Sequence, residues 1–342
     1  MDPNSSVNVA VIIPFFQRER GVLQRALRSV AAQTLMPTIA MTVFLVDDGS
    51  PVPVSEEVEA FDIPAPHQLV ILKQQNTGPG GARNCALDNI DPAHFDFVAF
   101  LDSDDEWLPC HLSQALISLG DEFDFYFCDH TRFDTKQSWF DDLDVTTAWK
   151  NSRETYLRQL DDRDSVFIVD PDDLFLGLLK EYLSQTSTVV FRFPNHSGLR
   201  FDTELRNAGE DHLFWLSLAS SSCAVISFDS NVYCGKGVNI YYSAFDWNLK
   251  SSVDRYGYLV LFYLKIRSKF PLNAAGQSIN NDNIRIFSRT YSYLFFRLFF
   301  KGKFPNISVT KTILHKSIYI VLLMPLNFII SAISGLDKRR SW

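Results

Sequence analysis

Three short apolar runs in the first part of the sequence, closed by Pro14, by Asp47-Asp48-Gly49-Ser50 and by Asp102, constrain the fold most strongly. These runs are residues 7–13, 41–46 and 95–101. Apolar runs of this length, rich in β-branched and aromatic residues, are typical of strands buried on both faces of a sheet. Residues 21–33 lie between the first two runs and carry apolar side chains at helical spacing, which predicts a strand–helix–strand unit of the parallel kind.

The pattern continues as one half of a doubly wound sheet. Residues 69–72 read as a further strand and 81–89 as a helix, with later strands expected at 187–193 and 224–228 and a helix at 213–219. Within residues 121–175, we expect an edge strand at 123–128 and a mobile loop at 161–173. Ligands of such sheets bind beyond the carboxyl ends of the strands. Residues 14–18, 47–48 and 102–105 all follow strands and therefore mark the predicted site.

The charge and length of the chain indicate two parts. The 342 residues carry a net charge of −8, but residues 241–342 hold 15 Lys and Arg against 4 Asp, or +11, which leaves −19 for residues 1–240. We therefore predict an α/β domain at 1–240 and a basic, hydrophobic helical region at 241–342. The acidic first part argues against nucleic acid as a partner, whereas a basic, aromatic tail is typical of a surface that lies on anionic lipid. The alternative is a tail that only neutralises the first part.

Several features favour a cytoplasmic protein at the inner face of the plasma membrane. The N-terminus has no basic and apolar export signal, and the five cysteines form no CxxC pair, which fits a reducing compartment. The longest apolar stretch, residues 318–333, is interrupted by Pro325 and Asn327 and is shorter than the ~20 residues that span a bilayer. Basic residues at four- and eight-residue spacing in 284–301 are predicted to lie along one side of a helix, and the tail as a whole is expected to lie on the membrane.

Three carboxylates stand within four residues at the end of the strand at 95–101. They belong to Asp102, Asp104 and Asp105. Crowded carboxylate oxygens suit a hard divalent cation such as Mg or Mn, which would take one or two of them and complete its shell with substrate phosphates. The alternative is an acidic turn that caps the next helix.

Two more segments at strand ends suggest nucleotide binding. Asp47 and Asp48 can accept hydrogen bonds from a nucleobase or ribose. Residues 76–84 form a Gly- and Pro-rich loop that leads into a helix, and Arg83 in it is suited to pair with a phosphate. The loop is neither a Walker loop nor a GxGxxG fingerprint, and it could be an ordinary turn.

In their order and spacing these segments resemble glycosyltransferase family 2, whose members have the GT-A fold and bind nucleotide-diphospho-sugars. The resemblance runs from Val9 to about Leu218 and rests on IPFFQRE, AAQT, LVDDGSP, NTGPGGARN, AFLDSDDEWLP and NAGEDHLFW. It implies a mainly parallel mixed sheet with helices on both faces. Phe16 and Gln17 depart from the usual Tyr and Asn of the first motif.

The resemblance also implies roles for single residues. Asp48 matches the uracil-contacting aspartate, Arg83 an arginine beside the diphosphate, Asp102 and Asp104 the metal-binding DxD pair, and Asp211 the general base. Glu210 is adjacent to Asp211 and is a second candidate for the base, although both could simply be acidic residues at a helix N-terminus. The remaining residues expected to line the donor site are Pro14, Phe16, Asp47 and Ser103.

The activity implied is an inverting, Mn- or Mg-dependent hexosyl transfer from a nucleotide-sugar, with UDP-sugars favoured. The acceptor would be a glycan or lipid-linked glycan in surface polysaccharide synthesis. The chain has no QxxRW motif, so one sugar per binding event is expected. A non-catalytic sugar-nucleotide-binding, membrane-docking protein of the same fold is the alternative. A nucleotidyltransferase would instead need a Gly-rich basic loop directly after the first strand, where Pro14 and its neighbours stand.

Overall fold

The computed structural model describes residues 6–334, except residues 60, 62, 134, 136 and 236–245. The described residues form two compact units: the first contains the chain up to Thr203 and from Phe214 onward to Gly235, and the second contains Glu204–Leu213 and the residues from 246. The predicted boundary at 240 lies outside the described residues. The structure moves one segment, Glu204–Leu213, from the predicted first domain to the second unit.

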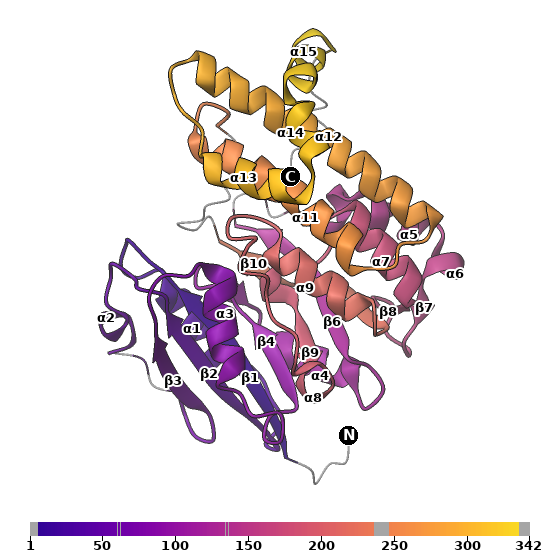
Figure 1. Cartoon of the computed structure of the whole chain (residues 1–342). Helices are drawn as coiled ribbons and strands as arrows, with labels where there is room; N and C mark the ends of the chain where they lie inside the picture. Colours follow the sequence, from indigo (N-terminus) through magenta and orange to yellow (C-terminus); the bar gives the residue numbers. More distant parts are fainter. Residues whose placement is uncertain are drawn as a thin grey trace. The chain divides into compact units, whose positions relative to one another are not determined.

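The first unit is built on one mixed sheet of ten strands among the described residues (Figure 1). The strands are β1 (Val7–Phe15), β2 (Ile39–Asp47), β3 (Gln68–Lys73), β4 (Phe97–Phe100), β5 (Glu106–Trp107), β6 (Phe125–Arg132), β7 (Arg158–Gln159), β8 (Val166–Val169), β9 (Val190–Arg192) and β10 (Ala224–Cys234). Their order is β3-β2-β1-β4-β9-β6-β10-β8-β7, and β5 pairs with β10. Most of the paired length is parallel, in β3-β2-β1-β4 and between β6 and β10, whereas β9, β8, β7 and β5 pair antiparallel.

Helices cover both faces of this sheet, as predicted. Those of the first unit are α1 (Leu23–Ala31), α2 (Val54–Val58), α3 (Pro79–Asp88), α4 (His111–Leu119), α5 (Asp144–Asn151), α6 (Arg153–Tyr156), α7 (Pro171–Lys180), α8 (Phe193–His196) and all but the first turn of α9 (Glu210–Ala219). Apolar residues of α1 and α4 share one buried cluster with every second residue of β1. On the opposite face α3 lies over β1 and β2 (Figure 1). Trp215 of α9 packs edge-on against Phe100 of β4, with ring centroids 5.7 Å apart.

Two local predictions were wrong. The strand expected at an edge is β6, which lies inside the sheet between β9 and β10. The segment expected to be a mobile loop contains β8 and the start of α7, and the side chains of β8 are buried. In both cases acidic residues beside the aromatic ones suggested exposure, while pairing with strands distant in sequence buries the apolar positions.

The second unit is helical. Its helices after residue 246 are α11 (Lys250–Lys269), α12 (Ala274–Phe300), α13 (Ile307–Lys316), α14 (Ile318–Leu322) and α15 (Met324–Ser334). Tyr263 of α11 stacks on Phe287 of α12 with centroids 5.4 Å apart, and α15 packs against α12. None of the described helices combines the length and apolar character needed to span a bilayer.

Gly257 allows a close approach between helices of this unit. A Cβ atom there would lie 2.5 Å from Cγ1 of Val309 and 2.9 Å from Cε2 of Tyr291. Alanine in a helix normally stabilises by about 1 kcal/mol relative to glycine. At Gly257 we expect this gain to be reversed, because overpacking costs ~1–3 kcal/mol.

Urea unfolding followed by circular dichroism would test this prediction, with Gly276→Ala as the matched control. The nearest atom to a Cβ at Gly276 is 3.5 Å away, an ordinary contact. Gly257→Ala should lower the free energy of unfolding, and Gly276→Ala should leave it unchanged or raise it. Equal stabilisation by the two variants would contradict the packing described here.

Candidate active site

The predicted donor-site residues of the first unit meet at one edge of the sheet. Strands β2, β1 and β4 are parallel neighbours, so their carboxyl ends coincide. This arrangement brings together Pro14, Phe16, Asp47, Asp48, Asp102, Ser103 and Asp104. The sequence prediction of a shared site at the strand ends therefore agrees with the topology.

Asp48 is buried and holds the loop before α3. Its Oδ1 accepts hydrogen bonds from Nε2 of Gln74 (2.7 Å) and from the backbone N–H of Thr77 (2.8 Å), and its Oδ2 accepts one from the N–H of Gly78 (2.9 Å). Gly78 has a φ of +86°, which favours glycine at this position. The carboxylate thus fixes the loop that leads into α3, in addition to the nucleobase contact predicted for it. The loop predicted at 76–84 ends at Gly78, so Arg83 lies on the helix.

Asp47, the neighbour of Asp48, stabilises the turn at residues 47–50. Its Oδ1 accepts a hydrogen bond from the N–H of Ser50 (2.8 Å), and Oγ of Ser50 accepts one from the N–H of Gln17 (2.8 Å). The hydroxyl of Ser50 also donates to the carbonyl of Gln17 (3.0 Å). These bonds join the segments that follow β1 and β2.

Arg83 is directed at the acidic segment. Its Nη2 lies 2.7 Å from Oδ1 of Asp102, and only 4% of its side chain is exposed. The guanidinium also lies over the ring of Phe201, 5.3 Å from the centroid. A buried ion pair of this kind orients both side chains. The predicted diphosphate-side arginine therefore neighbours the first aspartate of the predicted metal pair.

The two following carboxylates are buried close to each other. Burial raises the pKa of Asp104 to about 6, and the charge of Asp102 adds to the shift. Burial raises the pKa of Asp105 well above its ordinary value, and the charges of Asp104 and Asp102 contribute. A divalent cation beside Asp102 and Asp104 would relieve this repulsion, and hard oxygen donors suit Mg or Mn. Within the described ranges, no group of three or more His, Cys, Asp or Glu could hold a metal by itself. The residues thus fit a cation that is completed by substrate phosphates.

Asp105 anchors the acidic segment to distant parts of the chain. Its Oδ2 accepts hydrogen bonds from Oγ of Ser187 (2.6 Å) and Nε2 of Gln185 (2.9 Å), and its Oδ1 accepts one from the N–H of Gly235 (2.8 Å). Ser187 also accepts, at Oγ, a hydrogen bond from the N–H of Asp102 (2.9 Å). This carboxylate holds the backbone around Asp102 and Asp104 in place.

Sequence reasoning missed four of the residues that shape this site. Gln17 donates from Nε2 to Oγ of Ser103 (2.7 Å), and Arg25 donates to the carbonyl of Asp104. Gln185 and Ser187 hold Asp105. A polar Gln17 directly after an apolar strand was a usable signal. Gln185 and Ser187 lie about eighty positions from their partner, and nothing local indicates the contact.

Glu210 and Asp211 lie in the second unit, in the first turn of α9. Glu210 is buried and Asp211 is partly exposed. Oδ1 of Asp211 accepts a hydrogen bond from the N–H of His212 (2.7 Å), and the ring of His212 stacks on Phe262 with centroids 4.8 Å apart. His212 therefore packs against α11, and the role of Asp211 as a base stays a prediction.

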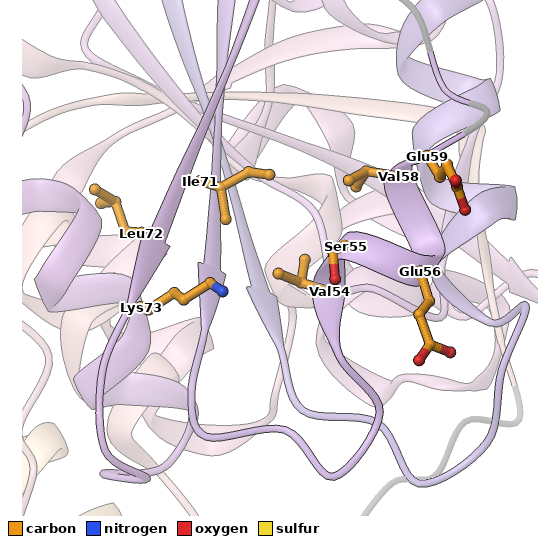
Figure 2. Close-up of a pocket in the computed structure, with 8 residues that line it drawn as sticks. All are labelled: Val54, Ser55, Glu56, Val58, Glu59, Ile71, Leu72 and Lys73. Atoms are coloured by element: carbon orange, nitrogen blue, oxygen red, sulfur yellow. The ribbon is translucent and has the colours of Figure 1, made fainter.

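A hollow of about 730 Å³ lies away from these residues, between α2 and the edge strand β3 (Figure 2). Val54 and Val58 of α2 face Ile71 of β3 across it, with Glu56, Glu59 and Lys73 at its rim. It contains none of the predicted site residues. A second hollow, of about 370 Å³, borders α3 and the loop held by Asp48 and includes Gln74, Thr77 and Asn84.

The role assigned to Asp105 predicts a loss of stability on Asp105→Leu. The change leaves three donors without their acceptor, those of buried Ser187 and Gly235 and of partly buried Gln185, and one buried donor left unpaired costs ~1–3 kcal/mol. The free energy of unfolding in urea should fall by at least that amount. Asp162→Leu, at an exposed position of the same unit, is the control and should change it little. A fall no larger for Asp105→Leu than for Asp162→Leu would contradict the anchoring role.

Comparison with known proteins agrees with the predicted family and fold. A family model described as glycosyl transferase family 2 matches residues 10–195. The succinoglycan biosynthesis protein ExoW of Rhizobium meliloti (strain 1021) is 36% identical over 246 residues, which cover 69% of this chain and 71% of that protein. The minor teichoic acid biosynthesis protein GgaA of Bacillus subtilis (strain 168) is 34% identical over 120 residues, 35% of this chain and 25% of that protein.

Solved structures share the fold at low identity. S. aureus TarS 1–349 in complex with UDP-GlcNAc has a TM-score of 0.53 at 17% identity, covering 97% of this chain and 93% of that one. The mannosyltransferase PcManGT from Pyrobaculum calidifontis, in complex with GDP-Man and Mn²⁺, has a TM-score of 0.55 at 15% identity, covering 100% and 84%. With the family model matching more than half of its residues, this chain belongs to glycosyl transferase family 2 and is a glycosyltransferase.

Proposed function

We propose that this glycosyltransferase moves one sugar at a time from a nucleotide-diphospho-sugar, with a UDP-sugar as the favoured donor, to a glycan or lipid-linked glycan. The observation that carries the proposal is the Arg83–Asp102 pair at the carboxyl end of β4, next to buried Asp104 and to the loop held by Asp48. The non-catalytic alternative has no comparable support, because the family is one of enzymes and Asp102, Asp104 and Asp211 are all present.

The names of the relatives support a place in polysaccharide synthesis. ExoW is named for succinoglycan biosynthesis and GgaA for minor teichoic acid biosynthesis. TarS binds UDP and UDP-GlcNAc, whereas PcManGT binds GDP-Man. A surface polysaccharide assembled on a lipid carrier, at the cytoplasmic side of the plasma membrane, is the setting that we propose for this chain.

The donor site works through charge and position. Asp102 and Asp104 would hold Mn or Mg, and the bound cation would neutralise charge on the departing nucleoside diphosphate. Arg83 orients Asp102 and places a positive charge beside it. Asp48 keeps the loop before α3 in place and presents a carboxylate next to the expected nucleobase position. Pro14, Phe16, Asp47 and Ser103 complete the lining.

The acceptor is activated by a carboxylate in this proposal. Asp211 takes the proton from an acceptor hydroxyl as the oxygen attacks the anomeric carbon. The bond from that carbon to the diphosphate oxygen breaks as the new glycosidic bond forms on the opposite face. The product therefore has the opposite anomeric configuration to the donor, and the nucleoside diphosphate leaves with its charge compensated.

Asp104→Asn tests the metal-binding role. It removes a charged oxygen from the proposed cation site, so transfer should be abolished and donor binding in Mn or Mg weakened. Calorimetric titration with UDP and assays of UDP-sugar hydrolysis measure the two effects. Exposed Asp162→Asn is the control and should behave as wild type. Near-normal turnover by wild-type enzyme in excess chelator would remove the metal from the mechanism.

Asp211→Asn tests the base. It should leave donor affinity largely intact and lower the transfer rate by a factor on the order of a hundred or more, because a positioned base contributes that much. Glu210→Gln is the matched neighbouring change and should be milder. If Glu210→Gln abolishes transfer and Asp211→Asn does not, the base is Glu210.

A further inference from the structure

The second unit leaves an unusual amount of apolar surface exposed. Of the seventeen large hydrophobic side chains that are exposed among the described residues, twelve lie between Phe299 and Ile333. Phe300 and Phe304 keep 70% and 67% of their surface exposed. We call the exposed residues from 299 to 333 the tail surface. Contiguous apolar surface of this kind marks an interaction site.

The aromatic part of the tail surface is continuous. Phe299 lies 5.8 Å from Phe300 and 5.9 Å from Phe304, measured between ring centroids. Phe300 also lies 5.7 Å from Phe328 of α15. The end of α12, the loop after it and α15 thus present one cluster of rings.

Helix α13, the next helix along the chain, has an amphipathic exposed side. Ile307, Lys311 and Leu314 are exposed and follow one another at spacings of four and three residues, so they share one side of the helix. Val309 and Ile313 are buried on the other side. The exposed side of α13 therefore carries two apolar residues and one positive residue, and these side chains are not part of the core.

The Lys and Arg residues around the tail surface are not balanced by nearby acidic residues in the sequence. Residues 283–334 contain seven Lys and Arg and no Asp or Glu. Lys301 and Lys303 donate to the neutral Asn248, and Asp246 nearby offsets only part of their charge. Two residues of the basic row predicted on α12 have partners within the chain. Arg285 pairs with Asp282 at 2.8 Å, and Arg297 donates to Asn248 at 3.2 Å.

The structure points to an anionic lipid surface as the partner of the tail surface, and we propose that Phe300, Phe304 and the exposed side of α13 enter the headgroup region while Lys303 and Lys311 contact lipid phosphates. A second copy of the chain is a poorer partner, because a two-fold interface would bring these cations face to face. A lipid surface supplies both negative charge and an apolar layer. The proposal narrows the sequence prediction, which assigned the lipid contact to the basic, aromatic tail as a whole.

Flotation of the full chain with vesicles tests this proposal without donor or acceptor, so its outcome is separate from that of the transferase reaction. Vesicles of phosphatidylcholine with phosphatidylglycerol should bind the protein, and phosphatidylcholine alone should bind it weakly. Lys303→Gln with Lys311→Gln should lower the partition coefficient about 25-fold at low salt, about fivefold for each charge, and much less at high salt. Phe300→Ser with Phe304→Ser should lower it at every salt concentration.

Matched variants control for general effects. Ile117→Ser removes a side chain that is 62% exposed on α4 and should not change vesicle binding. Arg285→Gln removes a cation of the α12 row and should have less effect than Lys311→Gln. Circular dichroism checks that each variant folds. If the double Phe variant misfolds, Phe304→Trp and Ile117→Trp replace it. Brominated lipid should quench the tryptophan fluorescence of Phe304→Trp more than that of wild type, and that of Ile117→Trp no more than that of wild type.

Three results would overturn the proposal. The first is full-length protein that does not float with anionic vesicles. The second is equal binding by wild type and the double Phe variant. The third is a dimer in lipid-free solution, detected by light scattering, that the double Phe variant abolishes, because the tail surface would then be an interface between copies.

Discussion

The structure of the donor site depends on the crowding of three carboxylates at the end of one buried strand. Asp102, Asp104 and Asp105 lie just after β4, and burial together with the charges of neighbouring carboxylates raises the pKa of Asp104 and of Asp105. Two of the three carboxylates have specific partners. Arg83 pairs with Asp102, and Asp105 accepts hydrogen bonds from Gln185, Ser187 and Gly235. These contacts bring α3, the segment before β9 and the end of β10 to one loop, which also carries Asp104.

The order of the strands makes this arrangement possible. Because β1 lies between β2 and β4 in parallel, the segments that follow the three strands are neighbours. Asp48 then ties the end of β2 to the loop before α3. The same helix carries Arg83 to Asp102. A few short bonds thus connect the residues predicted to contact nucleobase, phosphate and metal, and the sheet supports all of them.

Local patterns in the sequence predicted the strands that precede the site and the family motifs that mark it. Apolar runs and the acidic residues after them are short-range signals, so β1, β2 and β4 and the grouping of Asp48, Arg83 and Asp102 could be anticipated. The interior place of β6 and the partners of Asp105 depend on contacts between residues far apart in the chain. Asp48 was predicted only in part. The sequence indicated that it accepts hydrogen bonds from a ligand, but not that it also accepts them from the backbone of Thr77 and Gly78. Periodicity predicted a row of basic residues on α12, but it could not reveal that Asp282 and Asn248 contact Arg285 and Arg297.

The central claim is that the segment after β4 binds the diphosphate of the donor through a divalent cation. Anomalous diffraction from crystals grown with UDP and Mn²⁺ tests it most directly, because manganese is located independently of the protein model. The account predicts one anomalous peak in contact with a carboxylate of Asp102 or Asp104 and with a phosphate oxygen of UDP. Bound UDP with no such peak, or with the peak at other residues, would contradict it.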